Sequence, residues 1–294
     1  MYRAVDSLIS RTFKEGKPAI GLCATTIAFA IGSGGRGSKE IFTCNFDGSG
    51  MQQLTHNNSI STEPSWGPTV SSLVYTLYNH NCTDVALVDP PSKRQRPLSQ
   101  FPGLNSGATL SPSGAWVALT LSRDRQVELY IMHVASRQLV RLTRDAAVES
   151  SPCWSPDGSQ ICYVSDRGGK PRLYLIAARG GEAHTLPRGG GAESVSPDWS
   201  KVANKVCFAT GGGGNYQLAL LDMSAPRPVA LVIKTDKGGS YESPSWMPDG
   251  RHVVCTRQVG RNSRELCMVD TETGRVTRIL NAADTSLPSA SPLH

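Results

Sequence analysis

The chain has 294 residues, a net charge of +6 from 30 Lys and Arg against 24 Asp and Glu, and 39% hydrophobic residues. This length suits one large domain or two small ones, and the charged fraction of 18% with 29 Gly and 19 Pro argues against a coiled coil or a disordered chain. The positive charges are spread along the chain and the densest run, Lys93 to Arg96, is short, so we expect no nucleic-acid partner.

Two segments of different character open the chain. Apolar residues at Val5, Leu8 and Ile9 predict a short helix over residues 2–13. The apolar stretch from Ala19 to Ile31 imitates a signal peptide, but acidic residues interrupt its basic flank, no A-x-A cleavage site follows, and it is too short to span a membrane. We therefore expect residues 1–23 to form a lead-in helix and linker, with no clear signal peptide and no direct membrane insertion.

A repeat dominates the rest of the sequence, residues 24–294. Its most complete copy reads Trp-Ser-Pro-Asp-Gly from Trp154 to Gly158, and the copies are anchored at residues 66, 110, 154, 199, 246 and 290. Successive anchors are thus 44, 44, 45, 47 and 44 residues apart, and an apolar triplet begins seven residues after each of the first five. A regular period of this length is typical of propeller blades.

One unit, residues 149–188, shows how a copy is built. Four short apolar runs are separated by Asp157-Gly158, Gly168-Gly169 and Gly180-Gly181. Glycine supplies the positive φ that tight hairpins need, so the unit predicts a four-stranded antiparallel meander.

The two ends of the repeat region complement each other. Three strand-like runs, at residues 27–29, 40–43 and 52–55, precede the first anchor, and no strand follows the last anchor at Ala290. Together they would make one more blade, with the C-terminal strand joining the three N-terminal strands. We therefore predict an all-β, six-bladed β-propeller over residues 24–294; six anchors in register disfavour the alternative of a β-sandwich.

Residue patterns of catalytic and metal sites are absent from the sequence. No serine lies in a G-x-S-x-G motif, the six histidines lack metal-ligand spacing, and the eight cysteines form no C-x-x-C pair. Cys162 and Cys207 have apolar neighbours on both sides, which predicts buried thiols. We expect no catalytic residue, no metal and no cofactor; the redox state of the cysteines and a metal in the central channel stay open.

Inner strands of a propeller converge on one axis, so the residues that enter them are candidates for a binding funnel. Acidic, hydroxyl and apolar side chains alternate there, which suits the gripping of a polypeptide segment. The alternative is that these side chains only solvate loops and cap strands. The predicted partner-binding residues are Thr62, Glu63, Leu104, Asn105, Glu149, Ser150, Ser194, Tyr241, Glu242 and Leu287.

Several stretches together resemble the C-terminal propeller of the TolB family, the periplasmic component of the bacterial Tol-Pal system. These are the motif from Pro152 to Gly158, the Leu54-Thr55 and Leu142-Thr143 pairs, Asn57-Asn58-Ser59 ahead of Trp66, the lead-in with Ala24 to Phe29, and the closing stretch from Pro288 to Leu293. The resemblance covers essentially the whole chain.

That resemblance implies a non-catalytic, monomeric protein-binding propeller in the periplasm. It implies binding of a Pal-like peptidoglycan-associated lipoprotein at the mouth of the funnel, in support of outer-membrane integrity and constriction during cell division. By position, Leu104, Asn105 and Ser150 match loops that meet Pal. Family members also carry a signal peptide and a small α/β domain through which they contact other Tol proteins. We expect this chain to provide only the function of the propeller.

Two alternatives remain. Propellers with this repeat also occur in serine-peptidase-like proteins, where they gate substrate access to the active site. The chain could also be the product of a fragmentary TolB-like gene.

Overall fold

The computed structural model describes residues 22–32, 37–79, 82–260, 263–281 and 285–292. Within these ranges the regular elements are β-strands and a single 3-10 turn, η1 (Leu22–Ala24), which confirms the predicted all-β class. The helix predicted over residues 2–13 lies outside the described residues. In the part that is described, no helix is long and apolar enough to cross a membrane.

Four sheets each contain four antiparallel strands in chain order. The first two are β8 (Asn105–Leu110), β9 (Trp116–Leu121), β10 (Glu128–His133) and β11 (Leu139–Arg141), then β12 (Glu149–Trp154), β13 (Gln160–Ser165), β14 (Arg172–Ala177) and β15 (His184–Thr185). The next two are β16 (Glu193–Trp199), β17 (Lys205–Gly212), β18 (Asn215–Asp222) and β19 (Leu231–Val232), then β20 (Ser240–Trp246), β21 (His252–Gly260), β22 (Ser263–Asp270) and β23 (Val276–Asn281). Each sheet is the predicted meander, in which every strand pairs with the next along the chain.

The fifth sheet contains both ends of the described chain. It comprises β1 (Thr26–Gly32), β2 (Lys39–Asn45), β3 (Gln52–Gln53), β4 (Ile60–Trp66), β5 (Leu73–Tyr78), β6 (Thr83–Asp89), β7 (Arg94–Ser99) and β24 (Ser286–Ala290). A single parallel bridge between Lys39 and Ile60 joins its two halves. The C-terminal β24 pairs antiparallel with β1, with Ile27 opposite Ala290 and Ala28 opposite Ser289, so the last strand does join the N-terminal strands as predicted.

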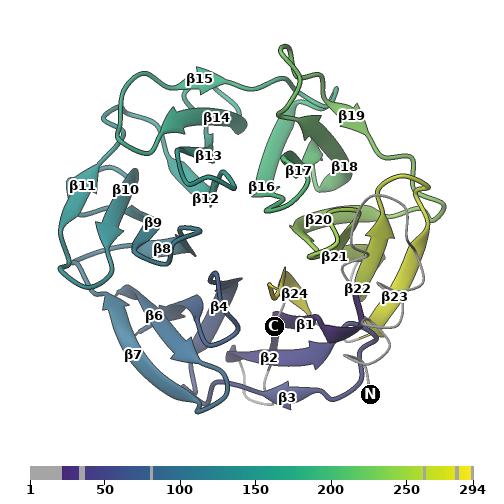
Figure 1. Cartoon of the computed structure of the whole chain (residues 1–294), viewed down its shortest axis with the longest axis horizontal. Coiled ribbons are helices and arrows are strands. Elements are labelled where there is room, and N and C mark those ends of the chain that lie inside the picture. The colour runs from purple at the N-terminus through teal and green to yellow at the C-terminus, as the bar shows by residue number, and fades with distance from the viewer. Residues whose placement is uncertain (1–21, 33–36, 80–81, 261–262, 282–284, 293–294) are drawn as a thin grey trace.

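The strand groups are arranged as blades around a central axis (Figure 1). In each group the strand nearest the axis carries a repeat anchor at or near its end; these inner strands are β4, β8, β12, β16, β20 and β24. The structure therefore has the propeller architecture that the repeat predicts, and it brings the starts of the inner strands together at one end of the axis.

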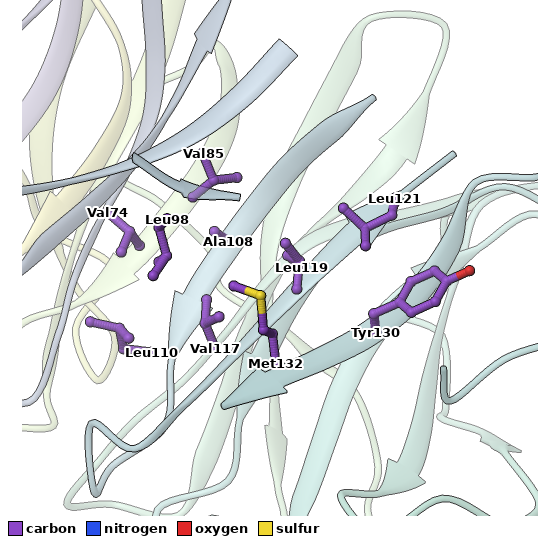
Figure 2. Close-up of a cluster of buried hydrophobic side chains, with 10 residues drawn as sticks. All are labelled: Val74, Val85, Leu98, Ala108, Leu110, Val117, Leu119, Leu121, Tyr130 and Met132. Carbon is purple, nitrogen blue, oxygen red and sulfur yellow. The ribbon is translucent and has the colours of Figure 1, made fainter. Parts of the chain in front are cut away.

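Apolar side chains fill the space between neighbouring blades. Figure 2 shows one such cluster, in which Val74, Val85 and Leu98 from β5, β6 and β7 pack with residues of β8, β9 and β10, including Leu119 and Met132. Five further clusters of this kind are described around the ring. Because each cluster is shared by adjacent blades, the blades stabilise one another.

The repeated tryptophan has a specific role at these seams. The indole Nε1–H of Trp66 donates to the backbone carbonyl of Ser289 at 3.1 Å, that of Trp154 to Thr109 O at 3.0 Å, and that of Trp246 to Asp198 O at 3.1 Å. In each case the acceptor lies in the preceding inner strand. The indole thus fills apolar space and satisfies a polar group across the seam at once.

Burial of the thiols agrees with the sequence prediction. Cys162 and Cys207 are fully buried, and burial raises the pKa of the Cys207 thiol well above its usual value. Cys255 and Cys267 are also fully buried and face each other across β21 and β22, with their Sγ atoms 3.5 Å apart.

Candidate functional site

All six inner strands have the same irregularity near their start. Three residues before each anchor, the backbone adopts a left-handed conformation with φ between 49° and 60°. The strand pairing shifts register at the same place, which marks a β-bulge. We call these residues the entrance residues: Glu63, Gly107, Ser151, Ser196, Ser243 and Leu287.

The entrance residues line a cavity of about 150 Å³ on the axis. A second cavity, of about 290 Å³, lies further along the inner strands and is lined by the anchors and by the prolines that follow several of them. The two cavities share one ring of wall residues, which therefore separates the entrance from the far end of the channel: Ser65, Thr109, Cys153, Asp198, Ser245 and Ser289.

Five of the predicted partner-binding residues lie at the entrance and are partly exposed. Glu63 and Leu287 line the axial cavity. Thr62, Glu242 and Leu287 line an adjacent surface cavity of about 440 Å³, which also contains Lys39 and Arg264. Ser150 precedes the entrance residue Ser151 and is half-buried.

Four other predicted residues are buried inside the blades instead: Asn105, Glu149, Ser194 and Tyr241. The reason is the alternation of a strand, in which successive side chains face opposite sides. The amide of Asn105 shows the consequence, because it binds the Ser99 hydroxyl at 2.6 Å and the Thr83 carbonyl at 2.8 Å. These four side chains are buried within the blades and do not line the axial cavity.

Leu104, the last of the predicted residues, is half-buried just before β8. Its backbone N–H donates to the Ser122 hydroxyl at 2.8 Å.

Glu149 is a buried carboxylate with a perturbed pKa. Its Oε1 lies 3.1 Å from the Arg167 guanidinium and accepts a hydrogen bond from Ser165 at 3.2 Å. Burial raises its pKa to about 7, and Asp145 adds to the rise while Arg167 opposes it. The proton is therefore held more tightly in the folded chain than in the unfolded chain.

Stability should consequently fall as pH rises through this window. Between the usual pKa of 4.5 and about 7, the folded state binds more protons at Glu149, so its contribution to the free energy of unfolding declines, by at most about 3 kcal/mol in total. Glu149→Gln should remove this decline, as measured by urea unfolding at pH 5 and pH 8. The exposed Glu182→Gln is the matched control, and an unchanged pH dependence in Glu149→Gln would contradict the assignment.

Asp198 is a channel-wall residue that the sequence analysis missed. Its Oδ2 accepts a hydrogen bond from the backbone N–H of Trp246 at 2.7 Å, and burial raises its pKa. The sequence contains one signal for it: Asp198 stands directly before an anchor, where the other five copies have a small residue, Ser, Thr or Cys. The carboxylate holds the seam between β16 and β20.

The described residues contain no group of three or more His, Cys, Asp or Glu side chains that could hold a metal ion. What the site offers is a narrow axial opening with hydroxyl groups, carboxylates and backbone N–H groups converging from several strands. Such a surface can recognise a segment of another molecule through hydrogen bonds and shape.

Comparison with known proteins identifies the family. The sequence profile of the TolB beta propeller domain matches residues 17–294. The chain belongs to the TolB beta propeller family. Among curated relatives, a protein TolB homolog of Chlorobium luteolum is 30% identical over 143 residues, which is 48% of this chain and 32% of that protein. The Tol-Pal system protein TolB of Francisella tularensis is 24% identical over 86% of this chain and 48% of that protein.

The chain thus spans about half or less of the length of these TolB relatives. A crystal structure of TolB from Acinetobacter baumannii has the same fold, with a TM-score of 0.85 and 21% identity over 99% of this chain and 71% of that one. Part of a puromycin-hydrolyzing peptidase of Mycobacterium tuberculosis is also similar in fold, with a TM-score of 0.59 and 15% identity over 86% of this chain and 45% of that one.

Proposed function

We propose that this chain is a six-bladed, non-catalytic propeller that binds a Pal-like peptidoglycan-associated lipoprotein at the channel entrance, as part of the Tol-Pal system. In this proposal residues 24–294 form the propeller and residues 1–23 lead into it. The protein works in the periplasm as a monomer and supports outer-membrane integrity and constriction during cell division. Contacts with other Tol proteins would need a further domain.

One observation carries the proposal: all six inner strands present an equivalent residue to a single axial cavity. A binding segment placed there would meet side chains and backbone from every blade. Membership of the TolB family and the name of the Francisella relative support the Tol-Pal assignment. The absence of a metal-binding cluster among the described residues is compatible with a binding role.

Arginine substitutions at the entrance should weaken binding, because the long side chain obstructs the surface that the partner contacts. Ser150→Arg and Glu242→Arg should each cost about 1–3 kcal/mol of binding free energy. Isothermal titration of the chain with a purified Pal periplasmic domain measures this directly.

The matched control is Glu182→Arg, the same charge reversal at an exposed residue between β14 and β15. It should leave the affinity unchanged. Equal affinities for all three variants would move the site away from the entrance. Peptidase activity in the purified chain would contradict the non-catalytic role.

A further inference from the structure

The part of the entrance between β4 and β8 already holds a carboxylate, which belongs to Glu63 of the chain itself. Oε2 of Glu63 accepts a hydrogen bond from the Thr76 hydroxyl at 2.8 Å and another from the backbone N–H of Gly107 at 3.0 Å. Glu63 and Gly107 are both entrance residues, on the neighbouring inner strands β4 and β8, with φ values of 53° and 60°. The side chain of one entrance residue therefore reaches the backbone N–H of the next.

The next part of the entrance, between β8 and β12, has the same two kinds of donor but no carboxylate. Gly107 has no side chain, and a Cβ built on it would lie 3.4 Å from Cδ of Pro152, 3.5 Å from the backbone nitrogen of Ser151 and 3.7 Å from Oγ1 of Thr120. Ser151 corresponds by position to Gly107, and Thr120 on β9 corresponds to Thr76 on β5. Both groups that bind the Glu63 carboxylate are thus repeated one blade further on, beside a place that no side chain fills.

This place is open to the axial cavity, which Glu63, Gly107 and Ser151 all line. The Thr120 hydroxyl now donates to the carbonyl of Ser106 at 3.2 Å and lies 3.1 Å from the Ser106 hydroxyl, and it would turn toward an incoming charged acceptor. Pro152 follows Ser151 and has no N–H, so the Ser151 amide is the donor that this bulge can offer.

Gly107 differs in this respect from the other entrance residues. The other five are Glu63, three serines and Leu287, so Gly107 alone among the entrance residues has no side chain. The unfilled place beside Gly107 therefore occurs at one of the six inner strands.

We propose that the entrance beside Gly107 binds a carboxylate of the partner, held by the Ser151 backbone N–H and the Thr120 hydroxyl as Glu63 is held by Gly107 and Thr76. Hydrogen bonds to a charged acceptor are stronger than hydrogen bonds to a neutral one, which favours a carboxylate over a neutral group at this place. The inference rests on the proposed function for the identity of the partner, but the site can be tested without it.

The decisive variant is Gly107→Glu. Glu63 adopts the same backbone conformation at the equivalent position, and the built Cβ makes contacts of 3.4 Å and longer, so the fold accommodates the change. The new carboxylate should occupy the site from within. Gly107→Ala is the matched control, because it adds the Cβ and leaves the carboxylate's place open.

The first measurement is the amide proton shift of Ser151 by NMR, with the capped peptides acetyl-Gly-Glu-Gly-amide and acetyl-Gly-Gln-Gly-amide as probes. In the wild type and Gly107→Ala, the Glu peptide should move this resonance downfield and the Gln peptide should not. Gly107→Glu should show the downfield shift without peptide and no further response, and Thr120→Val should weaken the Glu-peptide response. Equal responses to both peptides, or none, would overturn the inference.

The second measurement is affinity for the Pal periplasmic domain. Gly107→Glu should bind at least about tenfold more weakly than the wild type, and Gly107→Ala within about twofold. If the wild type does not bind Pal but the Ser151 resonance still responds selectively to the Glu peptide, then the proposed function is wrong and the carboxylate site is supported. Should Pal bind the wild type and Gly107→Glu equally, the carboxylate site is not used by that partner and the inference fails alone.

Discussion

Deleting residues 287–294 should lower the free energy of unfolding by at least about 4 kcal/mol, because a whole inner strand is lost. The deletion removes most of the β24 pairing with β1, including the partners of Ile27 and Ala28. It also removes the Ser289 carbonyl and hydroxyl, which accept hydrogen bonds from the Trp66 indole at 3.1 Å and the Trp66 backbone at 3.2 Å. The exposed edge of β1 should then favour association between molecules.

Urea unfolding followed by tryptophan fluorescence measures the loss, and size-exclusion chromatography measures association. A chain that ends at Pro292 keeps β24 and serves as the control. Equal unfolding midpoints for the two truncated chains would contradict the role of β24 in joining the chain ends.

The second large effect is expected at Trp66. Its side chain is 5% exposed and packs against β1, β2 and β5 residues in one cluster. Trp66→Ala should cost about 3–5 kcal/mol, since it leaves a large cavity at the seam and an unpaired carbonyl at Ser289.

Trp66→Phe separates the two contributions. It keeps most of the apolar volume and loses only the indole N–H, so the expected cost is about 1 kcal/mol. Denaturant unfolding of both variants gives the comparison. A cost for Trp66→Phe as large as that for Trp66→Ala would show that the hydrogen bond, and not packing, holds the seam.

The architecture could be predicted from the sequence because its determinants are local and repeated. Glycine at the hairpins and apolar triplets at a fixed distance from each anchor specify strands and turns without knowledge of distant contacts. The pairing of β24 with β1 followed from counting strands at the two ends. The seam contacts of the anchors, such as Trp154 with Thr109, needed the structure, because the acceptors are backbone atoms of another blade.

The candidate site was harder to predict, and the bulges explain why. Successive side chains of a strand face opposite sides, so the pair Glu149-Ser150 contains one residue inside the blade and one at the entrance, and the bulge that follows places Ser151 at the cavity. Residues before proline usually adopt extended conformations, so the sequence Ser151-Pro152 gave no indication of a positive φ. Ser151, Ser196 and Ser243 line the cavity but were not among the predicted residues.

Binding of a Pal-like domain at the entrance is the central claim, and hydrogen–deuterium exchange of the chain with and without that domain tests it most directly. We expect slower exchange in the complex for the segments that enter the inner strands, such as residues 60–65 and 105–109, with no change at the exposed β15 and β19 edges. Protection confined to the outer strands or to the far end of the channel around Pro112 and Pro156 would contradict it.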